Sequence, residues 1–268
     1  MTGNGFSIRS AIAAGSLAVL LIAAQAQAPT PPPGGFSLAL TLGPAWTSNP
    51  HEMPGRNKGD GSFGMEAIAA YRWALWEGGA LTVTGSGYSE LYFREDSAGL
   101  NRIGASATLS QRWRDISFTL TTSARTAANQ RFTAHDSASQ EIALGVSRSF
   151  TLAKDLTFTL SSGAARRFYQ DGTEDQVRAR LGATLAQKWG LLTLRIGAGF
   201  GYALEDKTPL LPRINDRTVS ATIGATYEWQ KDREISAKVT YSRTYSSLPL
   251  NRFKVFGFAP QVGATLRF

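Results

Sequence analysis

The sequence predicts an all-β protein, a twelve-stranded antiparallel up-and-down β-barrel, and three observations lead to this prediction. Apolar and small polar residues alternate over 10 to 14 positions in almost every stretch after residue 35. The connections between these stretches alternate between short and long, and an aromatic residue recurs about every 40 residues. Alternation puts the apolar residues of a strand on one face, whereas a helix would scatter them around its circumference.

The last predicted strand shows the alternation most regularly. Its apolar face carries Phe256, Phe258, Pro260, Val262, Ala264, Leu266 and Phe268. Applied along the chain, the same criterion predicts twelve strands. They cover residues 36–47, 62–75, 79–93, 101–113, 116–126, 139–150, 156–169, 176–188, 191–204, 217–229, 234–246 and 255–268.

Connections after even-numbered strands are short, as at 114–115, 189–190 and 230–233. Connections after odd-numbered strands are usually longer and polar, as at 48–61 and 205–216. Two long strands fall in each repeat, so the repeating unit is a hairpin, and six such units give twelve strands.

The aromatic residues recur at the ends of the even-numbered strands, on the apolar face, with spacings of 40, 37, 39, 40 and 39 residues. A repeat near 40 residues could also indicate a propeller, but a blade needs four short strands and each repeat here holds two long ones. Trp and Phe rings favour the headgroup level of a membrane, which predicts a membrane-interface girdle. Its members are Trp73, Trp113, Phe150, Trp189, Trp229 and Phe268.

Strand length separates a membrane barrel from a soluble sandwich. Strands of about 13 residues, at about 3.3 Å each and tilted near 40°, span about 33 Å, which is enough to cross the apolar band. Soluble strands are usually about 5 to 6 residues long. The apolar faces are therefore predicted to contact lipid, and the small polar faces to line the lumen.

The N-terminus has the three-part form of a secretory signal peptide. Residues 11–24 form an apolar run behind Arg9, and small residues follow up to Ala28. We predict a signal peptide over residues 1–26, a Pro/Gly-rich N-terminal lead-in over 27–35 and the barrel over 36–268. Removing Arg9 with the signal leaves 27 basic and 20 acidic residues, a net charge of +7.

With these features the sequence resembles the Gram-negative outer-membrane β-barrel proteins, porins among them. Val262, Ala264, Leu266 and Phe268 look like the C-terminal assembly signal of that class, although no individual family is resolved. The resemblance implies a location in the outer membrane and partners in outer-membrane lipid, lipopolysaccharide and the barrel assembly machinery.

Composition argues against several kinds of chemistry. The absence of Cys excludes thiolate metal sites and cysteine nucleophiles. The net charge of +8 is spread out, with Arg166 and Arg167 the sole adjacent basic pair, so we expect no nucleic-acid partner. The two histidines, His51 and His135, fall in predicted loops. We therefore expect no catalytic residue, metal or cofactor, and no enzyme.

The lumen-facing positions carry most of the functional information. In each predicted strand, every second residue faces the lumen. These positions hold ten cations and four carboxylates, Glu66, Glu90, Glu141 and Glu228. The cations are Arg72, Arg102, Arg112, Arg125, Arg167, Arg178, Arg180, Arg195, Lys238 and Arg267. Four carboxylates cannot pair ten cations, which predicts a cationic lumen unless loop carboxylates such as Glu174 or Asp175 balance it. An anion pathway is predicted at Arg102, Arg125, Arg167, Arg178, Arg180 and Arg195.

Turn positions predict how these cations are arranged. With residues 189–190 as a two-residue turn, Arg180 faces Gly199 and Arg178 faces Gly201. A turn near Gly172 places Arg167 beside Arg178.

Twelve strands lie between the eight that side chains can fill and the sixteen that leave a wide aqueous pore. The sequence therefore favours a passive, narrow channel for small solutes with a preference for anions. Two alternatives stay open: an export or surface-assembly barrel that works with periplasmic partners, and an outer-membrane lipid-modifying enzyme. Oligomeric state and the identity of the solute are not determined by the sequence.

Overall fold

The computed structural model describes residues 34–52, 59–94, 98–129, 135–170, 175–206 and 213–268. The predicted signal peptide, residues 27–33 of the lead-in and Glu174 lie outside the described residues, as do the side chains of His135 and Asp136. The described part of the chain contains no helix long and apolar enough to cross a membrane.

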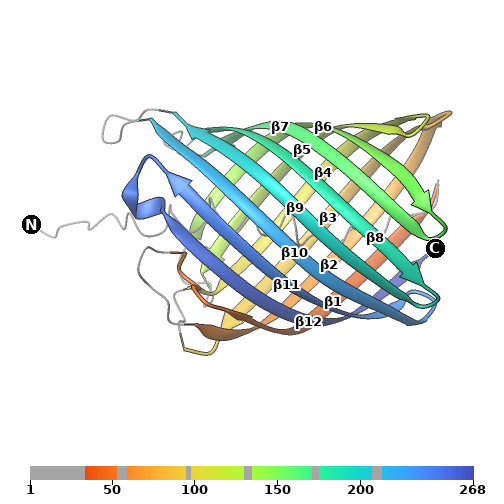
Figure 1. Cartoon of the computed structure of the whole chain (residues 1–268). Coiled ribbons are helices and arrows are strands. Elements are labelled where there is room, and N and C mark those ends of the chain that lie inside the picture. Colours follow the sequence, from red (N-terminus) through yellow and green to blue (C-terminus); the bar gives the residue numbers. More distant parts are fainter. Residues whose placement is uncertain (1–33, 53–58, 95–97, 130–134, 171–174, 207–212) are drawn as a thin grey trace, which may run out of the picture.

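Twelve antiparallel strands form one closed barrel in which each strand pairs with its neighbours in the sequence and β1 pairs with β12 (Figure 1). The predicted fold is confirmed. The strands are β1 (Phe36–Thr47), β2 (Asp60–Trp76), β3 (Gly79–Tyr92), β4 (Leu100–Trp113), β5 (Ile116–Asn129), β6 (His135–Ala153), β7 (Leu156–Tyr169), β8 (Gln176–Trp189), β9 (Leu192–Glu205), β10 (Ile214–Gln230), β11 (Arg233–Ser246) and β12 (Phe253–Arg267). A 3₁₀ turn, η2 (Pro249–Asn251), precedes β12.

Five two-residue turns, at 77–78, 114–115, 154–155, 190–191 and 231–232, close hairpins at the end of the barrel where the C-terminus lies (Figure 1). Each contains one residue in the left-handed region, with φ between 53° and 71°. We call this the short-turn end, and the opposite end, with the longer connections, the long-loop end.

The turn between β8 and β9 corrects the predicted register. Trp189 still pairs with Leu192, so the turn is Gly190-Leu191 and not Trp189-Gly190. Gly190 has a φ of +57°, a value that glycine adopts without strain. Gly190 is therefore the first residue of the turn, and the turn starts one residue later than predicted. As a result Arg180 faces Gly201 and Arg178 faces Ala203, two positions away from the predicted partners.

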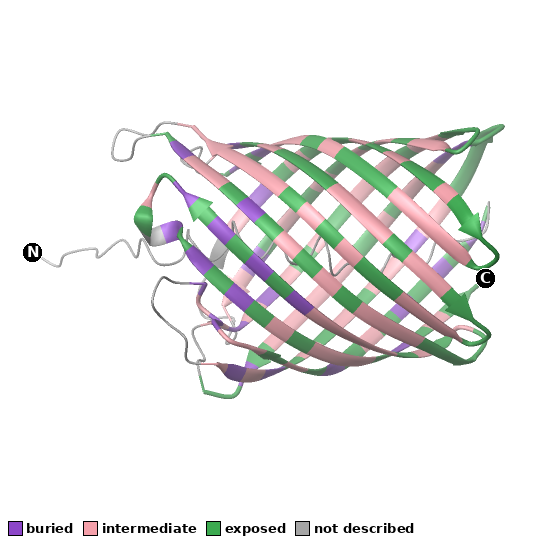
Figure 2. Cartoon of the chain, in the orientation of Figure 1, coloured by how far each residue is buried: buried purple, intermediate pink, exposed green. Residues whose placement is uncertain are grey.

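The outer face of the barrel is apolar on every strand. Exposed and less exposed residues alternate along the strands, as Figure 2 shows, and exposed side chains include Leu40, Ile103, Leu144, Leu181 and Ile223. Five of the six predicted girdle aromatics are exposed at the short-turn end, from 39% for Trp229 to 72% for Phe268. Phe150 is half-buried and stacks on Phe158, with ring centroids 6.2 Å apart. Such an exterior suits contact with lipid.

Candidate functional site

A cavity of about 890 Å³ occupies the lumen. Its lining runs from Asp232, in a short turn, up to Glu141, Gln176 and Arg178 nearer the long-loop end. Many of its wall positions are Gly, Ala, Ser or Thr. Inward-facing small residues on a strand leave the space that larger side chains would fill, and this is why the cavity exists.

Four of the six predicted pathway residues come together toward the long-loop end of the barrel, and one of them, Arg178, lines the cavity. Arg167 on β7 lies within electrostatic range of Arg102 on β4, Arg125 on β5 and Arg178 on β8, and Arg125 is also within range of Arg102 and Arg178. We call these four residues the arginine cluster. Because strand order in a barrel follows sequence order, cations on β4, β5, β7 and β8 share one arc of the wall.

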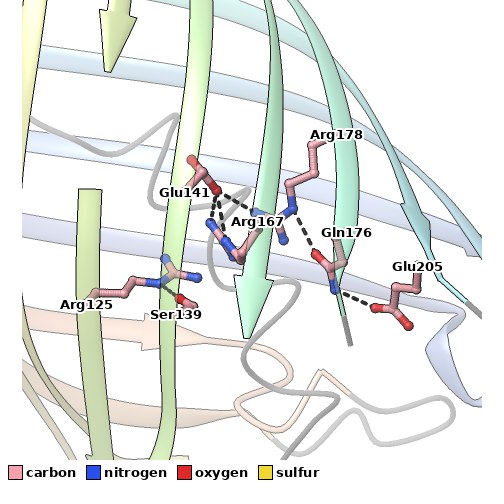
Figure 3. Close-up of polar contacts among 7 residues, drawn as sticks. All are labelled: Arg125, Ser139, Glu141, Arg167, Gln176, Arg178 and Glu205. Atoms are coloured by element: carbon pink, nitrogen blue, oxygen red, sulfur yellow. Dashed lines mark hydrogen bonds and ion pairs between the residues drawn. The ribbon is translucent and has the colours of Figure 1, made fainter. Parts of the chain in front are cut away.

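Glu141, on the intervening strand β6, is the carboxylate that joins the cluster (Figure 3). Its Oε2 accepts hydrogen bonds from Arg167 Nε at 2.9 Å and Nη2 at 2.5 Å. Arg178 Nη1 lies 3.9 Å from the same oxygen. Arg167 is directly opposite Gln176, not Arg178, which corrects the predicted pairing, but the two guanidinium groups still meet at Glu141.

The hydrogen-bond network continues along β8 to β9. Arg178 Nε donates to Gln176 Oε1 at 2.9 Å, and Gln176 Nε2 donates to Glu205 Oε1 at 2.6 Å (Figure 3). On the other side of Glu141, Arg125 Nε donates to Ser139 Oγ at 3.2 Å. A neutral hydroxyl leaves the charge of Arg125 in place, so this arc of the wall keeps a local excess of positive charge.

Arg167 is the most enclosed member of the cluster, with 3% of its side chain exposed. Its Nη1 is buried and has no hydrogen-bond partner among the described residues. A buried guanidinium depends on its carboxylate partner, because an uncompensated buried charge is costly. Glu141 is therefore a structural requirement of the cluster as well as its counter-ion.

Arg180 and Arg195, the other two predicted pathway residues, are separate from the cluster. Both are exposed and line the cavity: Arg180 lies two residues beyond Arg178 on β8, and Arg195 lies near the short-turn end of β9. Arg180 lies against Gly163, where an added Cβ would be 3.2 Å from its Nε. Arg195 Nη1 donates to Thr226 Oγ1 at 3.2 Å.

The predicted balance of ten cations against four carboxylates does not describe the cavity. Its lining holds six cations and seven carboxylates. Glu205, Asp216 and Asp232 were missed because they lie at or beyond the predicted strand ends, and Glu234 because it is the first residue of its predicted strand. The seven carboxylates are Glu66, Glu141, Glu205, Asp216, Glu228, Asp232 and Glu234.

The lining of the cavity itself therefore carries no positive excess. Of the loop carboxylates named as alternative partners, Asp175 has its Oδ2 3.8 Å from Arg166, and Glu174 lies outside the described residues. Negative charge occupies the neighbouring arcs. Glu90 on β3 accepts hydrogen bonds from Ser62 Oγ at 2.8 Å and Tyr88 Oη at 2.7 Å, and Glu205 and Asp216 lie on β9 and β10.

Within the described ranges, no three His, Asp or Glu side chains are grouped so that they could hold a metal ion. His51 is half-buried in the connection after β1.

Comparison with known proteins supports the fold. No protein-family model and no curated protein matches the sequence. Solved structures do match. An outer membrane channel from Pseudomonas putida F1 aligns over 88% of this chain and 97% of its own, with a TM-score of 0.58 and 11% identity.

Two further structures have TM-scores of 0.50. The translocator domain of the autotransporter NalP from Neisseria meningitidis covers 95% of this chain and 96% of its own, at 14% identity. The NanC porin covers 85% of this chain and 100% of its own, at 11% identity. At these identities the likeness concerns the fold. The closed barrel with its apolar exterior therefore has the fold of the outer-membrane β-barrel proteins.

Proposed function

We propose that this barrel is a passive, narrow channel for small solutes, and that the arginine cluster gives it a preference for anions. The observation that supports this proposal is the lumen cavity of about 890 Å³, whose lining includes Arg178 of the arginine cluster. A pore lined by clustered Arg raises the local concentration of anions, because the low-dielectric wall focuses the field of the charges. The balanced charges elsewhere in the cavity argue for a moderate preference.

Conductance across a planar bilayer tests this proposal directly. Purified barrel should give discrete conductance steps, and under a KCl gradient the reversal potential should have the sign of Cl⁻ selectivity. Preference should fall as salt rises, since the Debye length shortens from about 30 Å at 0.01 M to about 3 Å at 1 M. A folded barrel that does not conduct, or that selects K⁺, would contradict the proposal.

The two other functions make different predictions. An export or surface-assembly barrel would conduct little alone, and its deletion would remove a defined surface product. A lipid-modifying enzyme would release a lipid product whose formation depends on His51 or His135.

A further inference from the structure

The seam that closes the barrel is interrupted at one place. β1 and β12 are paired from Ser37↔Arg267 to Leu42↔Val262, and again at Trp46↔Phe258 and Thr47↔Gly257. Residues 43–45 and 259–261, which lie between these two paired stretches, have no partner across the seam. The register is the same on both sides of the interruption, so no residue has been inserted or lost.

Two prolines explain the interruption. Pro44 and Pro260 would be partners in this register. In an antiparallel ladder, residue pairs alternate between those that exchange two N–H···O bonds and those that exchange none. Phe36 and Phe268 exchange two bonds, of 3.1 and 2.9 Å, and Pro44 and Pro260 lie an even number of residues further along each strand. The prolines therefore occupy a position that requires two N–H donors, and neither has one.

The interruption is confined to this seam. Pro44 pairs normally with Phe63 on β2, and Pro260 pairs with Ala237 on β11. Each proline thus lacks only the hydrogen bond that would cross from β1 to β12. Between the pairs Leu42↔Val262 and Trp46↔Phe258, about 13 Å of strand is held together without ladder bonds.

Gly43 fits the interruption. A Cβ at this position would lie only 2.3 Å from the carbonyl oxygen of Pro260 and 2.9 Å from Cα of Gln261. The side chain of residue 43 would point into the lumen, so this carbonyl is turned toward the lumen side of the seam. Pro44 has no N–H to donate to the Pro260 carbonyl oxygen. This oxygen instead occupies the space where a side chain of residue 43 would begin, so only glycine fits at that position.

The two faces of the interruption suit passage through the wall. Outside, it is bordered by Leu42, Trp46, Phe258 and Val262, all exposed on the lipid face. Pro44 lies about 20 Å along the barrel axis from Phe36, within an apolar band of about 25 Å. Inside, the cavity lining reaches Thr41 and Gln261 on either side of the seam.

Polar groups lie close to the interruption on the lumen side. Lys238 is opposite Ala259, and Glu66 is opposite Thr41, each one strand away from the seam. Both line the cavity. A molecule that enters from the lipid would therefore contact apolar side chains first and charged groups immediately afterwards. A single-chain amphiphile matches this arrangement, because its acyl chain can lie against the apolar side chains while its polar headgroup reaches the charged groups.

We propose that the β1–β12 seam at Pro44 and Pro260 is a lateral portal, through which a monoacyl amphiphile such as a fatty acid passes between the lipid and the cavity. Opening it breaks no backbone hydrogen bond over the interrupted stretch. Ladder bonds on both sides limit the opening to a slot long enough for one acyl chain. This route is separate from the axial path of the proposed channel.

A disulfide across the seam tests the portal, because the chain has no native Cys. Thr41 and Gly263 are partners, and a Cβ at 263 would lie 3.6 Å from Oγ1 of Thr41, close to the geometry of a disulfide. Cells lacking other porins are given radiolabelled laurate. The native barrel should raise uptake above that of cells without it. The oxidised Thr41→Cys, Gly263→Cys variant should lose this increase, and a reductant should restore it.

A disulfide of the same residue types elsewhere in the wall is the matched control. Gly201 and Thr218 are partners between β9 and β10, and a Cβ at 201 would lie 4.0 Å from Cβ of Thr218. The oxidised Gly201→Cys, Thr218→Cys variant should keep full uptake. Equal loss in both variants, or unchanged uptake in the seam variant, would overturn the portal, as would a native barrel that adds no uptake.

Replacing the prolines tests the same idea without a cross-link. Pro44→Val with Pro260→Val supplies both missing donors and should abolish laurate uptake while bilayer conductance stays unchanged. Loss of both together would show that laurate takes the axial path, and would overturn the portal without affecting the channel proposal. Conductance absent already in the native barrel would contradict the channel proposal alone.

Discussion

The two ends of the lumen contrast in how they use charge. At the long-loop end, the arginine cluster is enclosed, and two of its members share one carboxylate oxygen. Further along the lumen, Arg180 and Arg195 lie apart from the cluster, exposed, in a cavity whose lining carries similar numbers of cations and carboxylates. Charges of one sign therefore have different consequences in the two regions. The charges of the arginine cluster affect both the stability of the barrel and the local electric field. Arg180 and Arg195 are solvated, so either can be replaced with little effect.

Glu141→Gln should give the largest difference between the regions. It removes the counter-ion of Arg167, which is 3% exposed, and stranding one member of a buried ion pair costs about 3–5 kcal/mol. Glu228→Gln, at an exposed position of the cavity wall, should change the free energy of unfolding by no more than about 0.5 kcal/mol. Urea unfolding of barrels in lipid vesicles measures both, and equal losses would show that burial does not distinguish the two carboxylates.

Selectivity should follow the cluster. Arg125→Gln with Arg178→Gln removes two charges while Arg167 keeps Glu141, so the barrel should fold and its reversal potential should shift toward cation selectivity, most strongly at low salt. Arg180→Gln with Arg195→Gln removes the same charge from the open region and should shift the potential less, because those cations are solvated. A larger shift from the second pair would place the selective region in the cavity instead.

The smallest expected effect concerns the width of the open region. Gly197 faces the cavity, and an added Cβ would make only ordinary contacts, 3.6 Å from Thr184 Oγ1. Gly197→Phe should therefore lower single-channel conductance with little loss of stability. Gly85→Phe is the control, since an added Cβ there meets nothing within 4 Å and by parity points to lipid. Equal conductance in the two variants would mean that the narrowest point lies at the cluster alone.

Much of this architecture could be predicted from the sequence because it depends on local signals. Alternation of side chains is a property of each strand, so the twelve strands, the lipid face and the inward direction of Arg167 and Arg178 follow from parity. Most predicted strand ends are within three residues of the observed ones, although β6 begins four residues earlier, at His135. Those few residues matter, because Glu205 and Asp216 lie just outside the predicted strands and complete the charge balance of the cavity.

Register and closure, by contrast, were decided by the tertiary structure. The partners of Arg178 and Arg180 depend on one turn residue, Gly190, whose positive φ moves the pairing by two positions. Convergence of Arg167 and Arg178 on Glu141 needs three strands in register at once. Pro44 and Pro260 lie at opposite ends of the chain, and only closure of β1 onto β12 makes them partners. The sequence by itself determined which face each side chain occupies, because alternation acts within one strand; only the closed barrel decided which side chains meet, because register is set between strands.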